Sequence, residues 1–206
     1  MGVAERRERE REEVRQKILD AARELFVSEG YEKVTMRRIA EAIEYSPTAI
    51  YLHFEDKDDL VLALCHDDFG RLLSVFQREE LPKDPVDRIR QLGKAYARFG
   101  LENPNHYRFM FMTPRSPEHK ADATDPGHQS FEFLRAAVVE AIETGAFFPS
   151  DPDTVAEVLW AGIHGAMALL IAVRSDCWPR PPAPDLVDQS IEAGLRAFLA
   201  RPALAH

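Results

Sequence analysis

Residues 35–54, TMRRIAEAIEYSPTAIYLHF, decide the fold of the first part of this chain. The pattern predicts two short helices joined by a tight turn. Thr35 is a candidate N-cap of the first helix, and Ser46 followed by Pro47 opens the second, because hydroxyls cap free N–H groups and proline fits the first helical position. Apolar residues stand before and after each cap at the spacing of a hydrophobic staple: Val34 and Ile39, then Tyr45 and Ile50.

Two helices this short are marginal alone, so we expect a third helix upstream to complete a bundle. The stretch 14–26 provides it, with Gly30 as its end signal. The apolar stripe of this stretch has helical spacing: Val14, Ile18, Ala21 and Leu25. A rigid trio of helices whose last member has a polar face is the geometry that places a recognition helix in the DNA major groove.

The stretch RIAEAIEYSPTAIYLHFEDKDDL, residues 38–60, resembles the N-terminal helix-turn-helix of the TetR/AcrR family of bacterial transcriptional regulators. The resemblance runs from about Arg15 to Leu64, and its most specific part is Ile50-Tyr51-x-His53-Phe54-x-x-Lys57. It implies a three-helix DNA-binding domain at residues 1–56 and a larger helical domain for ligand binding and dimerisation at 57–206. Because Ala, Leu, Glu and Arg dominate, we predict an all-α chain of about nine helices.

The resemblance implies DNA contacts at the first helix start, along the second helix and at the start of the next. The residues are Thr35, Arg37, Arg38, Ser46, Pro47, Thr48, Ala49, Tyr51, His53 and Lys57. Hydroxyls and free N–H groups at a helix start suit phosphate. The small residues Ser46–Ala49 let the backbone approach base edges, where methyl groups can touch thymine. Tyr51 and His53 suit phosphate contacts, with packing inside the bundle as the alternative for Tyr51.

Three residues depart from the family pattern. Glu44 stands where the turn usually has glycine, so either a non-glycine residue adopts a left-handed conformation or the turn closes differently. Ala49 stands where a threonine is common, so one phosphate contact is not expected there, and Leu52 stands where an aromatic residue is common. Each departure weakens the transfer of the family's contacts at its own position.

The formal net charge of −9 argues against binding to nucleic acid. Residues 1–53 are close to neutral, with ten Lys and Arg against eleven Asp and Glu. DNA binding must therefore depend on where the charges lie, and we expect it to weaken steeply with salt. The Arg/Glu run at residues 1–13 is either a solvated helix extension or an arm that touches phosphates or the minor groove.

Several classes of protein are disfavoured. No apolar run reaches the ~20 residues of a membrane span, the N-terminus has no apolar signal core, and Cys65 and Cys177 lack metal spacing. We expect a cytoplasmic protein that is not an enzyme, contacts no membrane and uses no cofactor, because no catalytic or nucleotide-binding motif is present. Three histidines could be drawn as a metal set, but nothing places them on one face, so no metal site is predicted: His106, His119 and His128.

In the second half, a capping residue followed by proline predicts three helix starts: Asp84-Pro85, Asn103-Pro104 and Asp151-Pro152. We expect helices at about 57–80, 85–101, 106–112, 131–143, 154–173 and 183–200, with a loop over 113–128.

The helix at 155–173 is apolar all round and should be buried on all sides. Its segment Trp160-Ala161-Gly162-Ile163-His164-Gly165 resembles the Trp…His-Gly signature of one TetR C-terminal subgroup. The resemblance implies a dimer built from two helices of each subunit, which would match a palindromic DNA site. The predicted interface residues are Gly162, Gly165, Leu186, Ser190, Ile191, Gly194, Leu195 and Phe198.

Aromatic and methionine residues exceed what a small helical core needs, so they indicate either dense packing or a pocket for a small apolar or aromatic effector. The candidate ligand-binding residues are Tyr96, Phe99, His106, Tyr107, Met110, Phe131, Trp160, His164 and Met167. An effector would act by binding one of two states more tightly.

The sequence therefore predicts a ligand-responsive transcriptional regulator that binds a palindromic DNA operator as a homodimer. The resemblance implies repression, which is the commoner behaviour in the family. Two alternatives stay open. One is a DNA-binding protein controlled by a protein partner, and the other is a ligand carrier with a vestigial helix-turn-helix.

Overall fold

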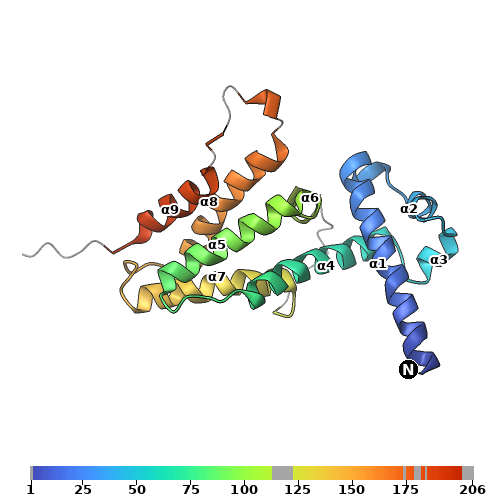
Figure 1. Cartoon of the computed structure of the whole chain (residues 1–206), viewed down its shortest axis with the longest axis horizontal. Coiled ribbons are helices and arrows are strands. Elements are labelled where there is room, and N and C mark those ends of the chain that lie inside the picture. The colour runs from blue at the N-terminus through green and yellow to red at the C-terminus, as the bar shows by residue number, and fades with distance from the viewer. Residues whose placement is uncertain (1, 113–122, 174, 179–181, 184, 201–206) are drawn as a thin grey trace, which may run out of the picture. The chain divides into compact units, whose positions relative to one another are not determined.

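The computed structural model describes residues 2–112, 123–173, 175–178, 182–183 and 185–200. Within this part of the chain the structure is helical, and an isolated bridge between Phe147 and Leu199 is its one piece of β pairing (Figure 1). The predicted all-α fold and the count of nine α-helices are confirmed for these residues. Most of the predicted loop at 113–128, and His119 with it, lies outside the described residues.

The α-helices in chain order are α1 Val3–Glu29, α2 Met36–Ala42, α3 Pro47–Tyr51, α4 Lys57–Arg78, α5 Pro85–Glu102, α6 Pro104–Met112, α7 Pro126–Glu143, α8 Pro152–Ala172 and α9 Leu186–Phe198. Two short 3₁₀ turns add to them, η1 Tyr31–Lys33 and η2 Ser175–Cys177.

The chain forms two compact units. Among the described residues, the first unit contains 2–69 and 105–112, and the second contains 70–104 and those that follow 122. The long helix α4 begins in the first unit and ends in the second, and α6 belongs with the N-terminal helices. The functional boundary between residues 56 and 57 stays a prediction.

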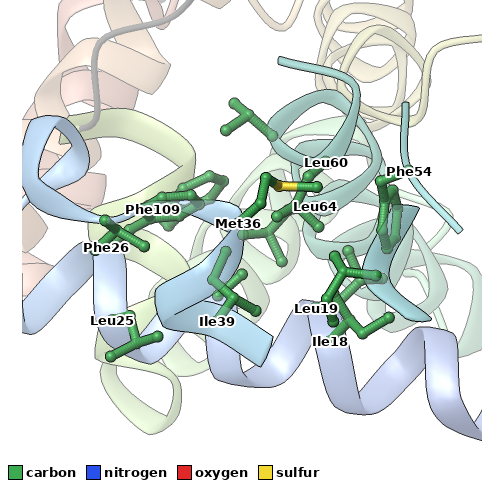
Figure 2. Packing of buried hydrophobic residues seen from close by; sticks show 14 of the residues in the cluster. Ile18, Leu19, Leu25, Phe26, Met36, Ile39, Phe54, Leu60, Leu64 and Phe109 are labelled. Atoms are coloured by element: carbon green, nitrogen blue, oxygen red, sulfur yellow. The ribbon is translucent and has the colours of Figure 1, made fainter. Parts of the chain in front are cut away.

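The first unit is built around one apolar core (Figure 2). The core residues come from α1, α2, α3 and α4, and α6 adds one ring: Ile18, Leu19, Ala22, Leu25, Phe26, Val34, Met36, Ile39, Ala40, Ile50, Phe54, Leu60, Val61, Leu64, Cys65 and Phe109. Phe109 stacks on Phe26 with ring centroids 5.7 Å apart. This contact makes α6 part of the same folding unit as the helix-turn-helix.

The predicted helix caps of the helix-turn-helix are present. The side-chain oxygen of Thr35 accepts a hydrogen bond from the backbone N–H of Arg38 at 3.1 Å, and that of Ser46 accepts from Ala49 at 3.2 Å. Val34 and Ile39 are fully buried, as a staple requires. At the second cap only Ile50 enters the core, because Tyr45 stays 37% exposed.

Glu44 adopts the left-handed conformation, with φ of 60°. This is the first of the two alternatives for the turn between α2 and α3, and no glycine is needed to close it. The turn is held by backbone bonds from Glu44 N to Glu41 O at 3.2 Å and from Tyr45 N to Ala40 O at 2.9 Å. Glu44 therefore stores strain that glycine would not.

A buried polar network crosses the first unit. Asp68 is fully buried and Arg23 is 4% exposed. Oδ1 of Asp68 accepts from Arg23 Nη2 at 2.5 Å and pairs with Nδ1 of His106 at 2.9 Å. Burial acts to lower the pKa of Arg23, but the hydrogen bond and charge of Asp68 outweigh it, so the pKa of Arg23 is raised and the group stays charged. The network joins α1, α4 and α6.

The second unit is a bundle of α5, α7, α8 and α9. Asp84 and Asp151 cap α5 and α8 as predicted. Two predictions were wrong in detail. The helix expected at 131–143 begins at Pro126, because Asp125 caps it. The side chain of Asn103 closes α5 by donating to Phe99 O at 2.9 Å and does not cap α6.

Helix α5 packs closely on its neighbours at Gly93. A Cβ atom there would lie 2.9 Å from Cδ1 of Ile163 on α8 and 3.2 Å from Cδ1 of Ile191 on α9. Only a residue without a side chain fits this approach without movement.

The expectation that α8 is buried on all sides was wrong for the single chain. One face packs in the bundle, while Val158 and Leu169 are 49% and 47% exposed. Between them lie the exposed residues Ala161, Gly162 and Gly165. By length and hydropathy α8 would also suffice to cross a membrane, a test that core helices of soluble proteins pass as well. An uncovered apolar stripe therefore runs along α8.

We predict that Glu44→Gly raises the free energy of unfolding by up to about 1 kcal/mol, because glycine avoids the cost of the left-handed conformation but loses more chain entropy. Urea unfolding followed by circular dichroism measures it. Glu44→Ala is the matched control: it removes the carboxylate, keeps the strain, and should give no gain. A gain from alanine equal to that from glycine would show that the charge, not φ, is responsible.

We predict that Asp68→Ala destabilises the protein by roughly 3–5 kcal/mol, because it leaves the buried charge of Arg23 without its main partner. Asp67→Ala is the control, since Asp67 pairs with the same guanidinium at 3.1 Å but is 21% exposed. It should cost less than about 1 kcal/mol. Equal losses of the free energy of unfolding for both variants would contradict this account.

Candidate nucleic-acid interface

Helix α3 has one buried and one exposed face. Ile50 is fully buried in the core of the first unit. On the other side Ser46, Pro47 and Thr48 are exposed, and Tyr51 is 54% exposed. Small and polar groups thus occupy the outer face, together with Leu52 at 72% exposure. This is the surface that a recognition helix must present to base edges.

The start of each helix offers hydrogen-bond donors to an anion. The Thr35 and Ser46 hydroxyl oxygens accept the capping bonds, so each O–H remains able to donate outward. Free backbone N–H groups of the first turns carry the positive end of the helix dipole. Both ends can therefore hold phosphate oxygens.

Arg37 and Arg38 have different environments. Arg37 is 80% exposed in its side chain and pairs with Glu41 at 3.0 Å, one turn along α2. Such an exposed pair is weak, so Arg37 can exchange it for a phosphate or a base. Arg38 is held to Glu29 of α1 at 2.7 Å and is half-buried. Arg38 therefore connects α2 to α1, whereas Arg37 pairs within its own helix.

Lys57 is anchored within the first unit. Its Nζ lies 3.8 Å from the centre of the Tyr31 ring and 5.6 Å from that of Phe26, and it donates a hydrogen bond to the Tyr31 carbonyl. The Tyr31 hydroxyl in turn donates to Asp58 at 3.0 Å. Burial, followed by this bond, raises the pKa of Tyr31 to about 12. Lys57 therefore fixes the start of α4. A phosphate bound there would compete with the Tyr31 ring and carbonyl for the Lys57 ammonium group.

His53 follows the end of α3 and is half-buried against Phe54, with ring centroids 6.4 Å apart. Burial lowers the pKa of His53, and the positive charges of Arg11 and Arg15 lower it further. The imidazole is therefore neutral at pH 7 and can donate a hydrogen bond without adding charge. Ala49 is half-buried on the same helix.

Some predicted ligand-binding residues gather in the second unit. The Tyr96 hydroxyl and Nδ1 of His164 are 2.9 Å apart. Trp160 lies beside His164 with ring centroids 5.3 Å apart, and Phe131 meets Trp160 edge-on at 6.3 Å. Burial lowers the pKa of His164, which favours the neutral ring. Phe99 and Met167 are buried in the same bundle.

The other three predicted ligand-binding residues belong to the first unit. His106 pairs with Asp68, while Tyr107 and Met110 are almost fully buried. Tyr107 packs against Phe111 with ring centroids 5.0 Å apart. All three therefore lie on α6, in the first unit, whereas Tyr96 and His164 lie in the second.

The predicted dimer residues separate into two groups. Gly162 and Gly165 are exposed, and an added Cβ at either would meet no atom within 4 Å. Ile191 and Leu195 are 2% and 1% exposed, so they pack the core of their own chain. Gly194 also faces inward, 3.0 Å from Leu159 as measured from an added Cβ. Leu186, Ser190 and Phe198 are half-buried.

Sequence reasoning missed two features of the first unit. The Arg23–Asp68–His106 network has no local signal, because its members are far apart in sequence. The Lys57–Tyr31 contact was hidden because Tyr31 lies in a 3₁₀ turn that the pattern did not indicate. Among the described residues no cluster of metal-ligating side chains is found.

Comparison with known proteins bears on this geometry. The model of the tetR family of bacterial regulatory proteins matches residues 18–64, and that of the tetracyclin repressor-like C-terminal domain matches residues 89–198. The chain is 28% identical over 186 residues to the HTH-type transcriptional repressor AcnR of Corynebacterium efficiens, covering 86% of this chain and 92% of that protein.

A second relative matches more closely over a shorter stretch. The chain is 48% identical over 67 residues to the HTH-type transcriptional repressor Rv1474c of Mycobacterium tuberculosis, covering 32% of this chain and 36% of that protein. The match to AcnR of Corynebacterium glutamicum is 38% identical over 112 residues and covers 54% of this chain and 52% of that protein. The chain thus spans about a third to a half of the length of these two relatives.

The fold is also that of solved structures. A bacterial regulatory protein in the tetR family from Rhodococcus RHA1 superposes with a TM-score of 0.74 at 22% identity, over 91% of this chain and 98% of that one. A Rhodococcus protein of unknown function superposes with a TM-score of 0.73 at 25% identity, over 90% and 95%. Since the C-terminal family model alone matches more than half of the residues, the chain belongs to the TetR family of bacterial regulatory proteins.

Proposed function

We propose that this protein is a cytoplasmic transcriptional repressor. It binds a palindromic operator as a homodimer and is released by a small apolar or aromatic effector. The observation that carries the proposal is the division of α3 into a face buried by Ile50 and a face of small, polar and exposed residues. A surface of this kind gains nothing from packing in its own chain and suits the major groove.

Repression is supported by the relatives, since both Rv1474c of Mycobacterium tuberculosis and AcnR of Corynebacterium efficiens are named as transcriptional repressors. A repressor needs only to occupy DNA and to leave it on a signal. No catalytic group is required for either step, which agrees with a family of regulatory proteins that are not enzymes.

Dimerisation is supported by the uncovered stripe on α8. Its members lie one helical turn apart along one face: Val158, Ala161, Gly162, Gly165 and Leu169. Glycines in this stripe would let the helix of a second copy approach closely, while Val158 and Leu169 supply apolar area. A two-fold pairing of this stripe would give a dimer that contains two copies of α3, as a palindromic site requires.

An aromatic effector is supported by the chemistry around Tyr96 and His164. The neutral imidazole and the phenol provide hydrogen-bonding groups, and Trp160 and Phe131 provide ring faces. Adding aromatic compounds to an operator-binding assay tests this part. Loss of DNA binding supports an effector, whereas no response to any compound favours control by a protein partner.

We predict that Arg37→Ala and Tyr51→Ala each weaken operator binding about tenfold or more, because a hydrogen bond to a charged phosphate contributes roughly 1.5–3 kcal/mol. Both side chains are mostly exposed, so thermal unfolding should be unchanged. Fluorescence anisotropy with a duplex selected from a random-sequence library measures the affinity. Lys94→Ala, which removes an exposed positive charge from the second unit, is the control. Unchanged affinity in both test variants would remove this mechanism.

We predict that Gly165→Leu gives a folded monomer, because the new side chain meets no atom of its own chain but blocks the stripe. Sedimentation velocity reports the mass, and circular dichroism the helix content. Gly93→Leu is the contrasting variant, since its side chain would collide with Ile163 and should unfold the bundle. A stable Gly165→Leu dimer would show that α8 is not the interface.

A further inference from the structure

The first turns of α1 extend beyond the core of the first unit. Helix α1 begins at Val3, whereas the first residue in contact with the core is Val14. Residues 4–13 are all exposed. In Figure 1 this end of α1 projects past α2 and α3. More than two helical turns therefore lie outside the apolar core of the first unit.

The arginines of this extension fall into two faces. At 3.6 residues per turn, Arg7 and Arg11 lie on the same side of α1 as the buried Ile18, within about 20° of it around the axis. Arg6 and Arg9 lie on the opposite side and pair with acids one turn on, Arg6 with Glu10 at 2.9 Å and Arg9 with Glu13 at 3.8 Å. Among the described residues Arg7 and Arg11 form no such pair.

The arginine face continues along α1 toward the segment that follows α3. Arg15, one turn after Arg11, places its guanidinium carbon 5.5 Å from the centre of the Phe54 ring, just past the end of α3. The charges of Arg11 and Arg15 are close enough to lower the pKa of His53. Acids also border this face: Glu12 lies 3.6 Å from Arg15, and Glu8 stands at its edge. The stripe of Arg7, Arg11 and Arg15 thus keeps a positive surface beside α3.

We propose that this arginine stripe on α1 is a second DNA contact, which binds the phosphate backbone beside the base pairs that α3 reads. The inference rests on the proposed DNA-binding function. Phosphate is the occupant that the charge selects, because the exposed guanidinium groups of Arg7 and Arg11, which have no acidic partner among the described residues, complement a polyanion. Bases are not needed for the contact, so it adds affinity without sequence preference.

The stripe also explains how the N-terminal part could bind DNA although its positive and negative residues are nearly equal in number. Since Glu10 and Glu13 pair with Arg6 and Arg9 on the far face, the positive charge on the side of Arg7 and Arg11 is larger than the sum suggests. A helix whose acids lie mainly on the far face can bind phosphate through the stripe without a net positive charge.

The test compares two double variants that each remove two positive charges from the same ten residues. Arg7→Gln with Arg11→Gln changes the stripe, and Arg6→Gln with Arg9→Gln changes the far face. Affinity is measured against salt concentration on a duplex selected from a random library by the unmodified protein. Two lengths of the duplex are used, one cut at the ends of the selected sequence and one with about six added base pairs on each side.

On the longer duplex we expect the stripe variant to bind at least tenfold more weakly. The slope of log affinity against log salt should fall by about 1.8 for each protomer, since each phosphate contact contributes about 0.9. The far-face variant should match the unmodified protein, and the difference should shrink on the short duplex. Glu8→Gln should raise affinity on the longer duplex.

Equal behaviour of the two double variants on both duplexes would overturn the second contact. If Arg37→Ala still weakens binding in that case, the proposed function stands and only the α1 contact fails. If the unmodified protein selects no duplex from the library, the proposed function itself fails. Circular dichroism of each variant confirms that α1 has kept its helix.

Discussion

Burial of Ile50 is the contact on which the DNA-reading surface depends. Helix α3 has five residues, too few to be stable alone, so its position comes from the core it enters. Ile50 is fully buried and Phe54 nearly so, and each contributes roughly 1.5–3 kcal/mol when removed from water. Because these two residues point inward, Thr48 and Tyr51 must point outward. These two buried residues thus set which side of α3 faces outward.

The same core explains why α6 belongs to the DNA-reading unit. Phe109 stacks on Phe26, and His106 pairs with Asp68, which itself holds Arg23 of α1. An apolar contact tolerates small shifts, but a buried ion pair has one good geometry and is costly to break. A movement of α6 that separated His106 from Asp68 would therefore be felt at α1.

Local signals predicted the helix starts well and the tertiary contacts poorly. Thr35 and Ser46 cap their helices as expected, because a cap is decided by four neighbouring residues. The Asp125-Pro126 start carries the same signal as Asp151-Pro152. It was predicted as loop because the residues before it are polar. The face of α8 could not be predicted from its sequence, because an apolar helix does not reveal which side its own chain covers. Glu44 shows the remaining limit. The sequence left two alternatives for the turn at this residue, and the structure has the left-handed one.

Charge placement links the two ends of the candidate interface. A chain with net charge −9 must keep its acids away from the phosphates it approaches, and on the N-terminal part of α1 Glu10 and Glu13 pair with Arg6 and Arg9 on the side away from Arg7 and Arg11. Arg38 is held by Glu29, and Lys57 is held by the ring and carbonyl of Tyr31. These two positive charges therefore hold the helices of the first unit together. Arg37, Arg7 and Arg11 are more exposed, and their charges are free to be exchanged for phosphate, so affinity should fall sharply when any one of them is removed.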